Sequence, residues 1–96
     1  MMVLITYDVE TMTPSGRKRL RQVAKQCVNQ GQRVQNSVFE CILDPAQFAS
    51  LKFILGEIID KEKDSIRYYQ LGNNWRSKVE HVGIKSSYDP EEPLII

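Results

Sequence analysis

The sequence is poor in the residues on which several common chemistries depend. It has two cysteines, Cys27 and Cys41, and one histidine, His81, and neither a CxxC nor an HExxH motif is present. A structural zinc site and a Cys/His nucleophile are therefore not expected, and we interpret His81 as a packing or surface residue. The five glycines are scattered along the chain, so no Gly-rich phosphate loop argues for a nucleotide cofactor.

Long apolar runs and a strong net charge are missing as well. No apolar stretch approaches the roughly 20 residues that a membrane-spanning helix needs. Since the sequence has no CxxC pair and no recognisable signal peptide, we expect a reduced, cytoplasmic protein without a membrane segment. The net charge of +1 excludes a polycation, but residues 1–36 carry six basic against two acidic side chains, so an anionic partner would meet this third of the chain.

The 96 residues are enough for one compact domain and too few for two. We expect a single domain over 1–96, with 86–96 as an extended tail because Pro90 and Pro93 deny this segment a helix. The core of so small a domain is thin, and pairing of two copies would extend it.

Hydrophobic patterning predicts two helices among short strands. Residues 2–9 alternate as a strand with Asp8 near its end. One helix is predicted to begin at Thr13-Pro14 and to end at Gly31, and a second to begin after the cap Asp44-Pro45. Their expected apolar stripes are Leu20, Val23, Ala24, Cys27 and Val28, and Phe48, Leu51, Leu55, Ile58 and Ile59.

The run 33–43 is long for one strand in a domain of this size, and the turn-forming residues 35–37 predict that it splits into a hairpin. With strands at 65–71 and 79–84, the order becomes β-α-β-β-α-β plus one more strand, which is a ferredoxin-like α+β sandwich. Without the split, the same helices would make a parallel sheet. In the ferredoxin-like arrangement the sheet face of Leu4, Thr6 and Asp8 lacks a cover, which favours a homodimer formed through that face.

Asp8 is the candidate for chemistry, because aspartate is a poor strand former and here follows a run of apolar residues. One interpretation is that its carboxylate caps the loop over 10–16. The other is metal ligation, in which a two-fold axis brings a second Asp8 from a partner copy to the same ion.

Several segments together resemble a known family. Tyr7-Asp8-Val9 ends the first strand, an arginine-rich helix follows, and the run 31–40 reads GQRVQNSVFE. The chain is similar over its whole length to the small CRISPR-associated nuclease of the spacer-acquisition machinery. Residues 80–83, EHVG, together with Tyr88-Asp89-Pro90 and Pro93-Leu94, resemble the form found in type I-C systems.

The resemblance implies a ferredoxin-like homodimer in which Asp8 lies beside the two-fold axis and holds Mg²⁺ or Mn²⁺ for cleavage of RNA or double-stranded DNA. It also implies that basic side chains contact nucleic-acid phosphates, and that the CRISPR integrase is a partner. The expected nucleic-acid-binding residues are Arg17, Arg19, Arg33, Arg76 and Lys78. Ser37 and Phe39 occupy further characteristic positions of the motif. The alternatives to a functional role are a hairpin turn for Ser37 and core packing for Phe39. For Arg33 the alternative is an ion pair.

Three functions remain in competition at this point. The chain is a metal-dependent endonuclease, or a non-catalytic DNA-binding adaptor of the integrase complex, or a toxin-like ribonuclease of the same architecture. An RNA-binding module of the RRM type is disfavoured because no pair of aromatic residues of that kind stands on the middle strands.

Overall fold

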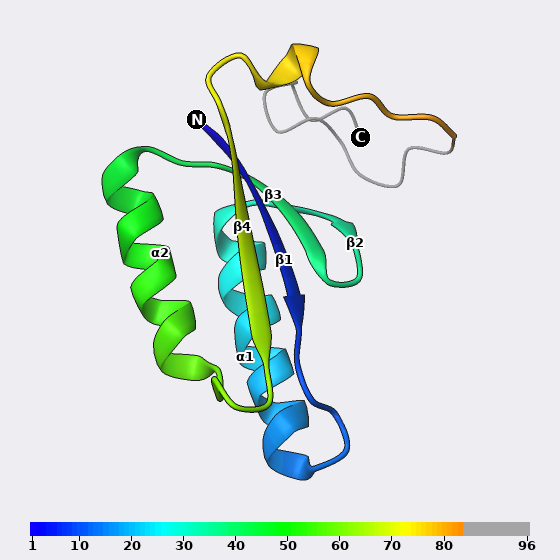
Figure 1. Ribbon diagram of the computed structural model, residues 1–96, viewed down its shortest axis with the longest axis vertical. Coiled ribbons are helices and arrows are strands. Elements are labelled where there is room, and N and C mark those ends of the chain that lie inside the picture. The colour runs from blue at the N-terminus through cyan, green and yellow to red at the C-terminus, as the bar shows by residue number, and fades with distance from the viewer. Residues whose placement is uncertain (84–96) are drawn as a thin grey trace.

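The computed structural model describes residues 1–83, which form a four-stranded antiparallel sheet with two helices packed on one face (Figure 1). The strand order is β2-β3-β1-β4, and both helices cross the same face, so the α+β, ferredoxin-like prediction is confirmed. The parallel alternative is wrong, because every pairing in this sheet is antiparallel. The elements are β1 (Met2–Asp8), α1 (Pro14–Gln30), β2 (Gln32–Gln35), β3 (Val38–Ile42), α2 (Pro45–Ile58), β4 (Ser65–Gly72) and the 3-10 turn η1 (Trp75–Ser77).

Strand β1 lies between β3 and β4. Its side chains point alternately to the two faces of the sheet. Val3, Ile5 and Tyr7 point to the helices and are buried, whereas Leu4 and Thr6 are half-buried on the other face and Asp8 is exposed there. The helix-side core joins β1 to the other elements through Val23, Cys27, Phe39, Cys41, Leu43, Phe48, Leu51 and Leu55.

Both helices begin as the sequence predicts. Thr13 caps α1 by accepting the amide of Gly16, and Asp44 forms a reciprocal capping box with Gln47 at the start of α2. Each cap uses one of the backbone amides that a helix start leaves without a partner. Most of the predicted stripe residues face the core, but Val28 is 54% exposed.

Gly31 ends α1, although its role differs from that of an ordinary glycine cap. Its backbone is extended, with φ −164°, which any residue adopts. The reason for glycine is a close approach, because a Cβ at this position would collide with Cys41 Sγ and the Glu40 carbonyl oxygen of β3. The absence of a side chain therefore lets the chain pass directly from α1 into the sheet.

The strand predicted over 79–84 is wrong for the residues that can be judged. Residues 79–83 are exposed and hold no strand, and Ile84 and the tail 86–96 lie outside the described residues. Gly72, with φ 75°, and η1 turn the chain away from the edge of β4, so residues 79–83 have no neighbouring strand to supply backbone hydrogen bonds (Figure 1).

Candidate functional site

Asp8 is the last residue of the central strand, on the sheet face that the helices leave uncovered. It pairs with Ser65 of β4, and Thr6, two residues earlier, pairs with Arg67. Its side chain is exposed, and within residues 1–83 its carboxylate takes part in no hydrogen bond or ion pair. The carboxylate is therefore available to a ligand.

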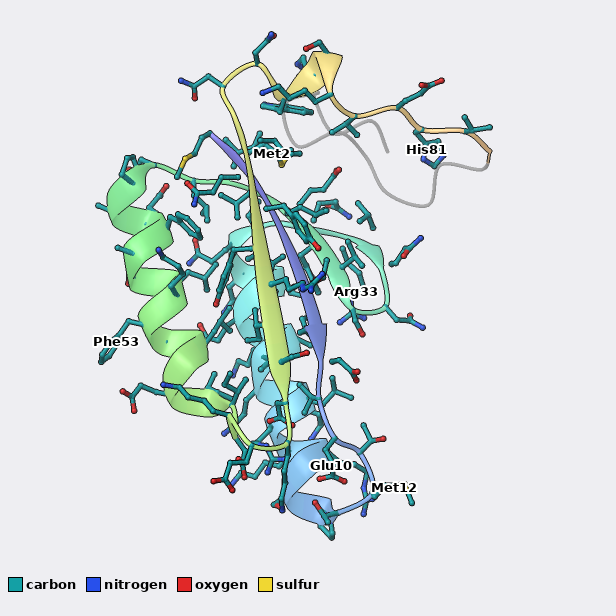
Figure 2. The ribbon with its side chains drawn as sticks, viewed as in Figure 1. Met2, Glu10, Met12, Arg33, Phe53 and His81 are labelled. Atoms are coloured by element: carbon teal, nitrogen blue, oxygen red, sulfur yellow. The ribbon has the colours of Figure 1, made fainter. Side chains whose placement is uncertain are left out.

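The loop that follows Asp8 is held by two other carboxylates. Glu10 accepts the amide and the hydroxyl of Thr13, both at 2.8 Å, and Asp64 accepts the amide of Glu10 at 2.9 Å. Figure 2 shows Glu10 in this loop beside the start of α1. The interpretation of Asp8 as the cap of this loop is therefore wrong, because the carboxylate that accepts the loop's hydrogen bonds is that of Glu10.

Asp64 organises this corner of the molecule. Its side chain is fully buried, and it also accepts Arg19 Nε at 2.7 Å and the Asp60 amide at 2.9 Å. Burial alone would raise the pKa of Asp64, but the hydrogen bonds from Arg19 and from the amides of Asp60 and Glu10 outweigh it and lower the pKa to about 2. Asp64 is thus a structural anion that joins α1, the loop after β1 and the start of β4.

The ion pair with Asp64 changes the interpretation of Arg19 as a nucleic-acid ligand. Arg19 is only 14% exposed at its side chain, and it lies 3.6 Å from Glu10 as well. Arg17, two residues earlier in the first turn of α1, is exposed and donates to the Thr11 carbonyl at 3.0 Å. Of these two predicted contacts, Arg17 is the one that presents its charge to solvent.

The remaining predicted basic contacts lie elsewhere. Arg76 places its guanidinium 4.7 Å from the centre of the Trp75 ring, and Lys78 donates to the Leu71 carbonyl at 3.1 Å. Both belong to the segment around η1, at the opposite end of the molecule from the start of α1 (Figure 1). Within one protomer they therefore do not extend the basic surface that begins at Arg17.

The motif run 31–40 forms the β2-β3 hairpin beside the end of β1. The turn residue Ser37 accepts the Tyr7 amide at 3.1 Å, and Phe39 is fully buried against the Tyr7 ring. Arg33 stacks over Phe39, 5.1 Å from its ring centre, and its register with Phe39 puts it on the opposite sheet face from Asp8. The hairpin-turn and core alternatives are thus confirmed for Ser37 and Phe39, and the expected ion pair of Arg33 is replaced by ring stacking.

A single protomer supplies one metal ligand of the predicted site. Among residues 1–83 no three His, Cys, Asp or Glu side chains come together as a metal-binding group. Magnesium in phosphate-processing sites is nevertheless held by one or two carboxylates together with substrate phosphates, and it keeps several of its waters. The free carboxylate of Asp8 fits this donor chemistry, and a second copy of the chain would add a second carboxylate.

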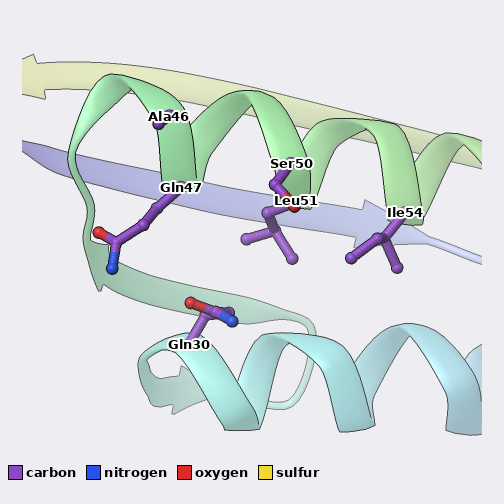
Figure 3. A pocket seen from close by; sticks show the side chains of 6 residues that line it. All are labelled: Gln30, Ala46, Gln47, Ser50, Leu51 and Ile54. Atoms are coloured by element: carbon purple, nitrogen blue, oxygen red, sulfur yellow. The ribbon is translucent and has the colours of Figure 1, made fainter.

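The hollows of the helical face carry different chemistry. One, of about 330 Å³, lies between the end of α1 and the start of α2 and contains amide, hydroxyl and apolar groups without a titratable side chain (Figure 3). A second, of about 600 Å³, lies further along the same helix pair, where Phe53 is 69% exposed. His81 is exposed beyond η1 and contacts the Gly83 carbonyl (Figure 2), so it is a surface histidine.

Two residues of this site, Asp64 and Arg67, were not predicted from the sequence. Asp64 reads as part of a charged turn, and nothing in its neighbours reveals that it is buried. Arg67 could have been assigned to the open face, because residues 65, 67 and 69 alternate with the core-facing Ile66 and Tyr68. Its position beside Asp8, however, depends on the register between β1 and β4.

Comparison with known proteins identifies the family. The family profile described as "CRISPR associated protein Cas2" matches residues 1–79, which is most of the chain. The chain belongs to the Cas2 family. The CRISPR-associated endonuclease Cas2 of Halalkalibacterium halodurans is 64% identical over 95 residues and 99% of each chain. The CRISPR-associated endoribonuclease Cas2 of Nitratidesulfovibrio vulgaris is 62% identical over all of this chain and 94% of that protein.

Solved structures, a Cas2 structure among them, share the architecture. The crystal structure of Streptococcus pyogenes Cas2 at pH 6.5 superposes with a TM-score of 0.76 at 64% identity, covering 86% of this chain and all of that one. A Thermus thermophilus protein superposes with a TM-score of 0.72 at 28% identity, covering 94% and 96% of the two chains. These similarities confirm the Cas2 fold. In the described part of this chain, neither helix has the length and hydropathy of a membrane span.

Proposed function

We propose that this Cas2-family protein is a metal-dependent endonuclease in which Asp8 holds Mg²⁺ or Mn²⁺. The observation that carries the proposal is the exposed carboxylate of Asp8, without a protein partner in residues 1–83, at the end of the central strand. The relatives are named endonuclease and endoribonuclease, which supports cleavage of a phosphodiester. When bound, the cation would orient a water and stabilise charge on the phosphate.

The chain's own residues would perform three tasks in that reaction. Asp8 would supply an anionic oxygen to the cation, while Glu10 and Asp64 fix the loop that follows it. In hydrolysis the water oxygen bonds to phosphorus, the phosphorus–oxygen ester bond breaks, and the leaving oxygen takes up a proton. Because Asp8 stands at a strand end rather than in a long loop, its position is set by the sheet.

We place the functional unit as a homodimer formed through the open face of the sheet. Leu4, Val38 and Ile42 lie on that face, and none of them is fully buried in the described part of the chain. Two copies that pair there around a two-fold axis would bury these side chains and bring two Asp8 carboxylates toward one ion.

The biological setting we propose is spacer acquisition with the CRISPR integrase, in the cytoplasm and in a system of type I-C. The two free, buried cysteines suit a reducing compartment, and the run 80–83 together with Tyr88-Asp89-Pro90 supports the type I-C assignment. Duplex DNA would meet Arg17 through phosphate contacts, which are strong, salt-sensitive and independent of sequence.

The deciding experiment compares the wild-type protein with Asp8→Asn on duplex DNA, single-stranded DNA and RNA, each with magnesium, manganese or chelator. Asp8→Asn retains the shape and removes the charge, so cleavage should fall at least about 100-fold while thermal melting stays unchanged, or rises if two metal-free carboxylates repel each other. Glu57→Gln removes an exposed carboxylate of α2 and is the matched control. Wild-type cleavage by Asp8→Asn would refute the metal assignment.

The second candidate is a DNA-binding adaptor that bridges integrase subunits without cutting. It is favoured by the lack of a complete metal cluster in residues 1–83 of one protomer. Integration assays with the integrase and Asp8→Asn separate the two, because an adaptor keeps full integration after that change. A toxin-like ribonuclease would instead arrest growth when the wild-type chain, but not Asp8→Asn, is expressed.

A further inference from the structure

The open sheet face carries a basic residue beside Asp8. Of the described strands, two contain an arginine or lysine: β2 with Arg33 and β4 with Arg67. Arg33 stacks on the core residue Phe39 and so belongs to the helix side. Arg67 lies between Ile66 and Tyr68, which pack on the helix-side core, and its side chain therefore emerges on the face of Asp8.

The register between β1 and β4 makes Arg67 a diagonal neighbour of Asp8. Asp8 pairs with Ser65 and Thr6 pairs with Arg67, so the two charged residues are one cross-strand step apart on the same face. Diagonal neighbours in an antiparallel pair have Cα atoms roughly 7–8 Å apart, within reach of a long side chain. Within residues 1–83 the two side chains nevertheless form no ion pair with each other.

The guanidinium of Arg67 is both exposed and oriented. One nitrogen, Nη1, donates to the Tyr69 hydroxyl at 3.1 Å, and Tyr69 lies on the same face two residues further along β4. In residues 1–83 Arg67 has no ion pair with a carboxylate. Its remaining N–H donors and its charge are thus free for an anion.

We propose that Arg67 binds the phosphodiester on which Asp8 acts. This inference rests on the proposed function, and it names the residue that would hold the substrate's scissile group. A guanidinium matches two non-bridging phosphate oxygens with parallel hydrogen bonds, and its charge favours the additional negative charge that develops as water attacks. Tyr69 acts as a positioning residue, because its hydroxyl holds the guanidinium.

Other basic residues are less suited to this task. Arg19 is committed to Asp64 and Glu10, and Arg33 faces the other side of the sheet. Arg17 is exposed at the start of α1, beyond the loop that follows Asp8, where it suits the flanking backbone of a bound nucleic acid. A phosphate is common to DNA and RNA, so Arg67 should act on whichever the protein cleaves.

The test uses the full chain with Arg67→Gln and Arg67→Lys, and with Lys52→Gln as the control. Lys52 stacks on Phe48 at the helical layer, so its substitution removes the same charge on the far side of the sheet. Cleavage is measured as kcat and KM, and binding as Kd for a 20-mer duplex DNA and a 20-mer single-stranded RNA in calcium. Arg67→Gln should lower kcat/KM roughly 10- to 100-fold, the range for losing a charge-assisted hydrogen bond.

The binding measurement supports or overturns the inference even where cleavage is slow. Arg67→Gln should weaken Kd for the cleaved class of nucleic acid and lower the slope of log Kd against log salt by about one. Arg67→Lys should recover the salt slope but little of kcat, because a lysine does not form the paired hydrogen bonds. Tyr69→Phe should show a smaller loss in kcat with KM nearly unchanged.

The outcomes separate this inference from the proposed function. If Asp8→Asn is inactive and Arg67→Gln binds and cuts as the wild type does, the phosphate assignment is wrong and the nuclease stands. If Asp8→Asn cuts normally, the assignment of Asp8 as the metal ligand is wrong, whatever the result for Arg67→Gln. If sedimentation shows that Arg67→Gln is a monomer whose binding returns fully at high protein concentration, Arg67 serves the contact between copies and the inference is overturned.

Discussion

Arg19 and Asp64, 45 residues apart in the chain, form an ion pair with a 2.7 Å contact between Nε and Oδ2, and the Asp64 side chain in it is fully buried. It joins the first turns of α1 to the turn before β4. The same carboxylate accepts the amide of Glu10, two residues after Asp8. The most buried charge among residues 1–83 therefore fixes the segment next to the candidate catalytic carboxylate.

This pair predicts that two neighbouring arginines behave differently. Arg19→Ala leaves the Asp64 carboxylate without its cation and should clearly lower the free energy of unfolding. Arg17→Ala should change it by less than about 0.5 kcal/mol. Urea unfolding of both variants is the measurement, and equal stability of the two would contradict the structural role of Arg19. A joint Arg17/Arg19→Glu variant is thus a poor probe of DNA binding.

The pair also predicts how stability depends on pH. The pKa of Asp64 is about 2 in the folded chain and near its ordinary 3.8 when unfolded. Because the folded value is the lower one, this carboxylate's contribution to stability is complete above about pH 4 and is lost as the pH falls toward 2. Carboxyl carbon shifts followed by NMR should give a midpoint for Asp64 near 2. A midpoint near 4 would show that the pair with Arg19 does not form in solution.

Two glycines predict opposite effects of the same substitution. Gly31→Ala should destabilise by about 1–3 kcal/mol, because its Cβ would collide with Cys41 Sγ and the Glu40 carbonyl. Gly56→Ala, inside α2 with open space around the position, should stabilise by roughly 0.5–1 kcal/mol. Chemical unfolding of the two variants checks both signs. A stable Gly31→Ala protein would show that α1 and β3 are further apart than the structure has them.

The C-terminal segment provides a prediction about assembly. Leu94-Ile95-Ile96 is apolar and follows two prolines, so it suits addition to a sheet edge of a partner copy or of an integrase subunit. Deleting residues 88–96 should weaken dimerisation or integrase binding, while helical circular dichroism persists because α1 and α2 lie outside the deletion. Sedimentation and co-purification with the integrase are the measurements. A truncated chain that remains a tight dimer and still co-purifies would rule out this docking.

Local patterns in the sequence were sufficient for much of the fold. Alternation assigned the two faces of β1, the caps Thr13 and Asp44 marked both helix starts, and the turn residues after Gln35 predicted the hairpin. Each of these features depends on neighbours within a few residues, so spacing along the chain reveals it. Asp8 was placed at a strand end on the open face for the same reason.

Only the tertiary structure decided which charged side chains form ion pairs within the protein and which remain available to a ligand. Arg17 and Arg19 look alike in sequence, but the fold brings only Arg19 to Asp64, a contact set by how α1 packs beside the turn before β4. The register of β1 against β4 likewise places Arg67 next to Asp8. The strand predicted over 79–84 failed in its described part because a strand depends on a neighbour's hydrogen bonds as well as on its own residues. Long-range pairing carries no local signature, because its energy comes from residues far apart in the chain.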